Sequence, residues 1–356
     1  MVYVHKPVLP DRATFDAYID LIYESRWLTN NGPLVQQLEK KLSQLLGCPN
    51  VILVSSGTSA LEVAIHAVAD GGEIITSPFS FAATSQAITY TGKTPTFADI
   101  CLDTFNLCPA HVEKAINENT SAIMPVHVYG NPCNIEKFED ISSRYNIPVI
   151  YDAAHCFGVN YKGQTIFNSG TLSVTSFHAT KLFHTIEGGA IFTNDHTLAE
   201  RIRKIINFGI QENGAIRGIG TNAKMNEFEA AMGLSLLPKL DHILHSRKLI
   251  WDIYHKAFKD IFQLQLWRTE TDKNYAYFPL VFKSEQSLIN VISVLEQEGI
   301  YPRRYFYPTL DTIYNSKSLA NASSISNKVL CLPIYPDLPL EIVHRTIDLV
   351  IQKGDK

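Results

Sequence analysis

Two stretches decide the fold of this chain: Ser176-Phe177-His178-Ala179-Thr180-Lys181 and, shortly after it, Glu187-Gly188-Gly189-Ala190. An apolar run over residues 172–177 leads into the first stretch, and another over residues 190–193 leaves the second. Short apolar runs bounded by Gly, Pro or Asn are typical of parallel strands that are buried on both faces. Lys181 therefore follows the end of a buried strand, and no carboxylate stands at helical spacing on either side to pair with it.

The same pattern of short apolar runs extends upstream from Lys181. Residues 51–54 read as a buried strand, and residues 59–68 have the apolar spacing of a helix that Gly71-Gly72 ends. Further strands are expected at residues 73–76, 122–126 and 148–151. Strands that alternate with helices in this way indicate an α/β fold with a mainly parallel sheet.

The last third of the chain has a different organisation. A polar loop at residues 209–220 precedes helices at residues 225–237 and 240–258, and a strand at residues 275–282 and a helix at residues 288–298 follow. At 356 residues the chain is long for a single core, so we expect a large domain over residues 1–240 and a small α+β domain over residues 241–356.

Composition excludes several classes of protein. The formal net charge is −4 and no long basic run is present, which argues against a general affinity for nucleic acid. No apolar stretch approaches the ~20 residues that cross a bilayer, and the N-terminus lacks a signal-peptide core, so we expect a cytoplasmic protein without a membrane partner. The six cysteines form no C-x-x-C pair, so we expect reduced thiols and no metal.

Three features together indicate a cofactor. Asp152 ends an apolar strand, where a carboxylate needs a cationic or hydrogen-bonding partner to stay ionised. Ser55-Ser56-Gly57-Thr58-Ser59 joins a strand to a helix and can seat a phosphate. Lys181 supplies an amine that can form an imine. Taken singly, these could be a turn-capping aspartate, an N-cap with a turn glycine and a surface lysine; together they match the needs of pyridoxal phosphate.

The chain resembles, over essentially its whole length, the DegT/StrS family of sugar-nucleotide aminotransferases. The matching segments are Trp27-Leu28-Thr29-Asn30-Asn31-Gly32-Pro33, Ser56-Gly57-Thr58-Ser59-Ala60-Leu61, Pro78-Phe79-Ser80-Phe81, Pro125-Val126-His127-Val128-Tyr129-Gly130, Asp152-Ala153-Ala154-His155, Ser176 to Lys181, Asn222-Ala223-Lys224-Met225 and Tyr305-Phe306-Tyr307-Pro308. The resemblance implies the aspartate aminotransferase-like fold, type I of the pyridoxal-phosphate enzymes, with a mainly parallel seven-stranded sheet in the large domain. Lys224 stands where the family usually has arginine, and Thr185-Ile186 stand where many members have glycine.

The resemblance also implies a role for individual residues. Lys181 would hold the internal aldimine and move the proton in catalysis, and pyridoxamine phosphate would be the intermediate. The cofactor-binding residues would be Gly57, Thr58, Ser59 and Ser176 at the phosphate, Phe81 stacked on the ring, Asp152 at the ring nitrogen, His155 near the phenolic oxygen, and Asn222, which would reach the phosphate of the neighbouring subunit. A homodimer with shared active sites follows from that last role.

Substrate contacts are expected from a second set of residues. This set is Trp27, Thr29, Asn31, His127, Tyr129, Arg304, Tyr305 and Tyr307. Aromatic clusters in a small domain are often core, so Tyr305 and Tyr307 could instead pack internally. Arg303 and Arg304 could pair with a diphosphate or form a solvated pair.

The implied reaction is a ping-pong transamination in which L-glutamate gives its amino group to a keto-sugar carried on a nucleotide diphosphate. The segments around Lys6-Pro7, Lys181 and Arg304 look most similar to enzymes that aminate C4 of dTDP-4-keto-6-deoxyglucose. The product would be dTDP-4-amino-4,6-dideoxyglucose, a precursor of surface polysaccharide such as O-antigen lipopolysaccharide. The alternatives are a C3-aminotransferase, a pyridoxal-phosphate lyase or cysteine desulfurase, and a non-catalytic sensor with this fold; intact Lys181 and Asp152 count against the sensor.

Overall fold

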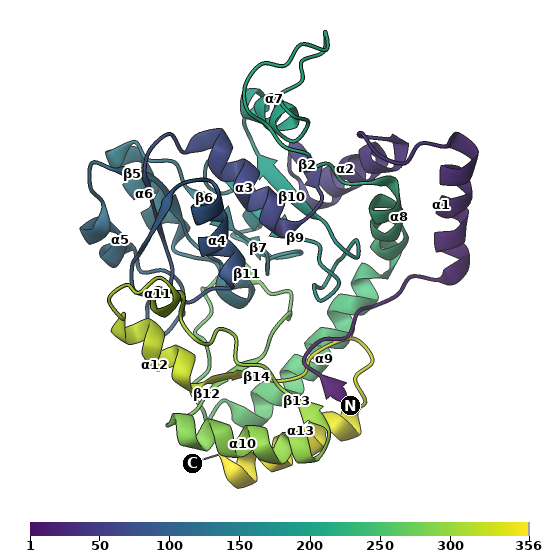
Figure 1. Cartoon of the computed structure of the whole chain (residues 1–356). Helices are drawn as coiled ribbons and strands as arrows, with labels where there is room; N and C mark the ends of the chain where they lie inside the picture. The colour runs from purple at the N-terminus through teal and green to yellow at the C-terminus, as the bar shows by residue number, and fades with distance from the viewer. Residues whose placement is uncertain (355–356) are drawn as a thin grey trace.

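The computed structural model describes residues 1–354. At its centre two ladders, of four and three strands, together make a seven-stranded sheet, and Figure 1 shows its position in the molecule. A four-stranded ladder has the order β2-β10-β9-β6, and a three-stranded ladder has the order β4-β3-β5. Parallel bridges from Ile123 to Val149 and from Val126 to Asp152 join the two ladders. The strands are β2 (Asn50–Val54), β3 (Glu73–Thr76), β4 (Thr94–Phe97), β5 (Thr120–Met124), β6 (Ile150–Asp152), β9 (Leu172–Ser176) and β10 (Gly189–Thr193).

The expected α/β class with a mainly parallel sheet is confirmed. The pairs β3–β4, β3–β5 and β6–β9 are parallel. Residues 190–193 form the expected strand as part of β10, but the expectation that it is parallel to its neighbours was wrong, because β10 is antiparallel to both β2 and β9. Local hydrophobicity reports the burial of a strand but not its direction, which depends on how the chain returns to the sheet.

Helices cover both faces of the sheet, which explains why its strands are apolar throughout. In β2, Val51 and Leu53 belong to one buried cluster, while Ile52 and Val54 belong to another, as the alternation of side chains in a strand requires. The elements of this part are α1 (Arg12–Ser25), α2 (Pro33–Leu46), α3 (Gly57–Val68), α4 (Ala82–Tyr90), α5 (Pro109–Ala115), α6 (Ile135–Tyr145), α7 (His196–Ile205), α8 (Glu227–Leu236), the short strands β7 (Asn160–Tyr161) and β8 (Gln164–Thr165), and the 3-10 turns η1 (Val128–Gly130), η2 (Ile166–Asn168) and η3 (Leu237–Lys239).

The C-terminal part has a separate apolar cluster, built around Tyr254, Phe258, Phe278 and Leu288. The N-terminal strand lies here too, because β1 (Val2–Tyr3) pairs in parallel with β13 (Ile300–Tyr301), as Figure 1 shows in purple beside the green C-terminal elements. The other elements are α9 (Leu240–Phe258), β11 (Thr271–Asp272), β12 (Pro279–Val281), α10 (Glu285–Gln297), α11 (Leu310–Ile313), α12 (Ala320–Lys328), β14 (Val329–Cys331) and α13 (Leu340–Lys353). A domain boundary at residue 240, where α9 begins, stays a prediction.

The fold brings several chain segments to one edge of the large sheet. β6 ends at Asp152, β9 ends at Ser176, and β2 leads into the N-terminus of α3 at Gly57. Aromatic side chains of the C-terminal part, among them Tyr277 and Phe306, form a cluster with residues of the large sheet's loops. A ligand site at this edge is the usual arrangement in α/β proteins. Within residues 1–354, no helix combines the length and apolarity that a membrane span requires.

Candidate active site

A pocket of about 310 Å³ opens at this edge of the sheet. Its walls come from both parts of the chain. The residues expected at the cofactor or substrate that line it are Gly57, Thr58, Phe81, Asp152, His155, Ser176, Lys181 and Tyr305. Their convergence from positions far apart in the sequence makes this pocket the candidate active site.

Asp152 lies buried at the end of β6 with its carboxylate held by two donors. The hydroxyl of Thr84, on α4, donates to Oδ2 at 2.7 Å, and the amide of Ala154 donates to Oδ1 at 3.2 Å. Burial raises the pKa of Asp152, whereas these two hydrogen bonds and the Lys181 charge act in the opposite direction. A cationic partner in the pocket would favour the ionised carboxylate further.

Lys181 follows β9 in a tight turn, in which its amide donates to the His178 carbonyl at 2.9 Å. Burial lowers the pKa of the Lys181 amine to about 8, although Asp152 and Cys156 act to raise it. Near neutral pH a useful fraction of the amine is therefore unprotonated, which is the form that attacks a carbonyl.

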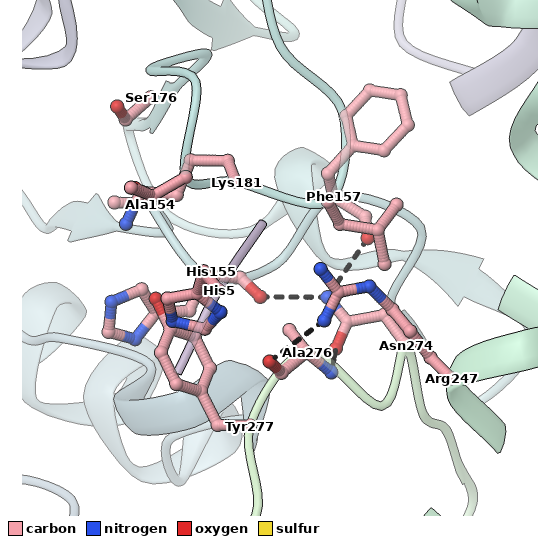
Figure 2. Close-up of a pocket in the computed structure, with 12 residues that line it drawn as sticks. His5, Ala154, His155, Phe157, Ser176, Lys181, Arg247, Asn274, Ala276 and Tyr277 are labelled. Atoms are coloured by element: carbon pink, nitrogen blue, oxygen red, sulfur yellow. Dashed lines mark hydrogen bonds between the residues drawn. The ribbon is translucent and has the colours of Figure 1, made fainter. Parts of the chain in front are cut away.

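His155 and Lys181 both line this pocket, and both also line the smaller adjoining cavity that Figure 2 shows. Its Nδ1 accepts a hydrogen bond from the Tyr129 amide at 3.1 Å. Burial lowers the pKa of His155 well below its usual value, and Lys181 and His5 lower it further. The ring is therefore neutral, and since Nδ1 is an acceptor, the proton is on Nε2, which can donate to a ligand oxygen.

The N-terminus of α3 and the end of β9 form a cradle for an anion. Ser56 caps the helix by accepting from the Ser59 amide at 3.0 Å, and Ser59 Oγ lies 2.6 Å from Ser56 Oγ. A Cβ at Gly57 would lie 2.6 Å from the Ser176 Cβ, so glycine is required for this close approach. The helix dipole and the hydroxyls of Thr58 and Ser176 favour a phosphate at this place.

These residues fit pyridoxal phosphate. The pocket offers a phosphate cradle, a buried carboxylate for the ring nitrogen and an amine of lowered pKa. Phe81, 62% exposed at the start of α4, presents an aromatic face at the pocket wall. A planar ring could stack on that face.

Comparisons with known proteins agree with this geometry. Residues 11–351 match the model of the DegT/DnrJ/EryC1/StrS aminotransferase family. The chain belongs to that family. It is 39% identical to the dTDP-4-amino-4,6-dideoxy-D-glucose transaminase of Shigella dysenteriae and 38% identical to that of Escherichia coli, in each case over 98% of both chains. The crystal structure of DesI in the presence of its TDP-sugar product matches with a TM-score of 0.93 at 32% identity, over 98% of this chain and 92% of that one.

Family membership makes the protein a pyridoxal-phosphate-dependent aminotransferase. Of the residues that the family resemblance assigned to substrate, Tyr305 lines the pocket. Trp27, Thr29 and Asn31 are exposed, and Asn31 lines a second hollow of about 510 Å³ together with Lys224. Asn222 is also exposed and is bridged to Asn207, which lines that same hollow.

The remaining expected substrate residues of this aminotransferase are engaged with its own chain. His127 is buried and stacks on Tyr151 with the ring centroids 4.6 Å apart. Tyr129 is buried, and its hydroxyl donates to the Tyr305 carbonyl. Arg304 pairs with Glu285 at 2.7 Å, and its guanidinium lies 3.5 Å from the centroid of the Tyr307 ring. Contact between these side chains and a substrate stays a prediction.

Sequence reasoning missed two groups at the site of this aminotransferase. Thr84 and Ser80 form a buried hydroxyl pair, 2.7 Å apart, that leads to Asp152. Arg247 and His5 approach Lys181 from α9 and from the N-terminal segment. Thr84 lies one helical turn after Phe81, which is the one local signal that could have suggested it.

Proposed function

We propose that this enzyme transfers the amino group of L-glutamate to C4 of dTDP-4-keto-6-deoxy-D-glucose and so forms dTDP-4-amino-4,6-dideoxy-D-glucose for a surface polysaccharide. One observation carries the reaction class: the Lys181 amine, with its lowered pKa, lines the same pocket as the Asp152 carboxylate. The choice of sugar is supported by the relatives at 39% and 38% identity, which are dTDP-4-amino-4,6-dideoxy-D-glucose transaminases.

Bound pyridoxal phosphate supplies an electron sink for the carbon that loses its proton. In this proposal Lys181 would hold the cofactor, and its Nζ would then move the proton between the substrate carbon and the cofactor C4′. Asp152 keeps the ring nitrogen protonated, and His155 donates from Nε2 to the phenolic oxygen. Gly57, Thr58 and Ser176 hold the phosphate. Ser59, whose hydroxyl lies 2.6 Å from that of Ser56, would complete the cradle at the helix end.

We infer in addition that the enzyme works as a homodimer in which Asn222 contributes to the partner's site. Its exposure on this chain, near the hollow that Asn31 and Lys224 line, supports that role. Asn222 is not among the residues that line the pocket of Lys181 in its own chain, so in this proposal it would reach a cofactor across a dimer interface.

The visible absorption of the protein with pyridoxal phosphate tests the proposal. We expect a band from the cofactor bound to Lys181, which L-glutamate bleaches and dTDP-4-keto-6-deoxy-D-glucose restores. A band that glutamate bleaches and this sugar fails to restore would keep the transamination and discard the sugar. Absence of any band would contradict the role of Lys181. Product analysis then separates amination at C4 from amination at C3.

A further inference from the structure

A second, smaller cavity lies behind Lys181, next to the main pocket. Figure 2 shows that Lys181, His155 and Tyr277 line it together with His5 and Arg247. Lys181, His155 and Tyr277 also line the main pocket, so the two spaces adjoin. The small cavity measures about 10 Å³, which is room for roughly one water-sized group. It can receive only the end of a ligand whose remainder lies in the main pocket.

Arg247 projects into this region from α9 and is 2% exposed. Its Nη1 donates to the carbonyls of Ala276 at 3.2 Å and Ile334 at 3.0 Å, as Figure 2 shows for Ala276. Its Nε is buried without an acceptor in the described part of the chain. These hydrogen bonds fix the guanidinium but use only part of its donor capacity.

The charge of Arg247 also lacks a counter-ion in residues 1–354. The residues that line the cavity include no Asp or Glu. Burial lowers the pKa of Arg247 to about 10, and the Tyr277 hydroxyl is the one group that acts to raise it. Other partly buried arginines of the chain are compensated: Arg203 pairs with Glu39, Arg268 with Glu136 and Arg304 with Glu285.

His5, which lines the same cavity, is a possible hydrogen-bond donor beside Arg247. Burial, together with the charges of Arg247 and Lys181, lowers the pKa of His5 to about 3, although the backbone of Ile334 acts to raise it, so this ring is neutral. Both ring nitrogens of His5 are buried, and neither makes a hydrogen bond of normal geometry within residues 1–354. A neutral imidazole keeps one N–H that can donate to an anion. A buried cation without a counter-ion is unfavourable, and an incoming anion removes that cost.

We propose that Arg247, assisted by His5, binds the α-carboxylate of the amino donor. This inference rests on the proposed function. The donor nitrogen must reach the same carbon of the cofactor as the Lys181 amine, so donor atoms within a few bonds of that nitrogen lie near Lys181. In L-glutamate the α-carboxylate carbon is two bonds from the nitrogen and the side-chain carboxylate carbon is four. The carboxylate that can place an oxygen in this small cavity lined by Lys181 is therefore the α-carboxylate, and a guanidinium suits it well.

The diphosphate of the sugar nucleotide is a poorer occupant. Two phosphate groups cannot enter a cavity of about 10 Å³. The exposed arginines, such as Arg303, are better placed for groups that extend toward solvent. In this proposal the cavity is therefore occupied when the amino donor binds and not when the sugar nucleotide binds.

The test is equilibrium binding of two donor analogues to the enzyme loaded with pyridoxal phosphate, measured by calorimetry. The first, 2-methyl-L-glutamate, keeps both carboxylates but lacks the hydrogen that transamination removes. The second, 4-aminobutyrate, lacks the α-carboxylate. We expect Arg247→Gln to weaken binding of 2-methyl-L-glutamate by about 10- to 100-fold and to leave 4-aminobutyrate within about twofold.

Arg268→Gln is the matched control, because Arg268 also has a buried Nε without an acceptor but is paired with Glu136. It should leave both affinities within about twofold. Unchanged binding of 2-methyl-L-glutamate to Arg247→Gln, or equal losses for both ligands, would overturn the assignment. So would a loss confined to the sugar nucleotide.

Two further measurements keep the outcome clear. If Arg247→Gln does not fold, Arg247→Lys replaces it, because lysine keeps the charge but not the planar guanidinium. This variant should reduce the preference for 2-methyl-L-glutamate over 4-aminobutyrate by about fivefold or more. An unchanged preference would refute the proposal. Bleaching of the wild-type band by L-glutamate checks the proposed function separately. A band that responds to glutamate in wild type and equally in Arg247→Gln contradicts only the role of Arg247.

Discussion

The Thr84 hydroxyl donates a hydrogen bond of 2.7 Å to the Asp152 carboxylate, and so links α4 to the end of β6 at the base of the pocket. Ser80 Oγ lies 2.7 Å from Thr84 Oγ1. Because a hydroxyl has one proton, Thr84 gives it to Asp152 and accepts from Ser80. The chain Ser80–Thr84–Asp152 thus orients the carboxylate and favours its ionised form against the cost of burial.

Replacing Thr84 by valine should disturb the cofactor electronically while preserving the shape of the site. Loss of the hydrogen bond raises the pKa of Asp152 further, so less of the ring nitrogen stays protonated. We expect turnover to fall about tenfold, which corresponds to ~1.4 kcal/mol for one charge-assisted hydrogen bond. Thr89→Val, on the exposed side of the same helix, is the control and should keep its activity. Equal activities of the two variants would mean that Thr84 does not support Asp152.

Lys181→Ala should abolish turnover and leave the fold intact, because the covalent attachment of the cofactor and the proton transfer depend on the same amine. Steady-state assays and circular dichroism of the purified variant measure the two effects. Residual activity above a few per cent of wild type would rule out the assignment of Lys181.

The pKa of Lys181 predicts how cofactor uptake depends on pH. The attacking species is the neutral amine, so the rate at which the cofactor-free protein gains its visible band should rise with pH and level off above pH about 8. An unperturbed lysine would continue to gain rate up to pH ~10.4. The free energy of unfolding should also rise with pH. The buried, protonated Lys181 destabilises the fold most below pH about 8, and this cost falls away as the pH rises from about 8 to 10.5, the ordinary pKa of lysine. A rate that still climbs well above pH 9 would show that Lys181 is not perturbed.

Gly57→Ala tests the phosphate cradle. The added methyl would meet the Ser176 Cβ at 2.6 Å, so α3 and β9 must move apart and their phosphate contacts loosen. We expect the affinity for pyridoxal phosphate to fall about tenfold or more in a fluorescence titration. Gly72→Ala is the control, because a Cβ there meets nothing within 4 Å. If both variants bind the cofactor as wild type does, the phosphate lies elsewhere.

Much of the fold could be predicted because its strands are buried on both faces and its strand ends carry distinctive residues. Residues 240–258 formed the predicted helix, and Lys181 and Asp152 lie together as expected. β4 was missed because it is an edge strand with Pro95 within it, which weakens the local signal. The strand expected at residues 275–282 is shorter, since β12 spans Pro279–Val281.

The unpredicted features depend on contacts between distant parts of the chain. Thr84 meets Asp152 across 68 positions, and Arg247 reaches the carbonyl of Ile334 across 87. Neither residue stands out in its own neighbourhood: one is a helical threonine and the other an arginine of an amphipathic helix. Both residues belong to the site because packing of the helices and strands buries their polar groups beside it. The local sequence does not report that packing.

Mixed dimers test whether active sites are shared. If Asn222 serves the partner's site, a dimer of one Lys181→Ala chain and one Asn222→Ala chain has both defects in one site and neither in the other. Equal mixing of subunits that exchange freely makes about half of the dimers mixed, so about a quarter of wild-type activity should return. Dimers carrying a different affinity tag on each chain can be isolated and should show about half. If Asn222 serves its own subunit instead, every site in a mixed dimer carries one defect and no activity returns. Activity that stays at the level of the separate variants in verified mixed dimers would therefore exclude a shared site at Asn222.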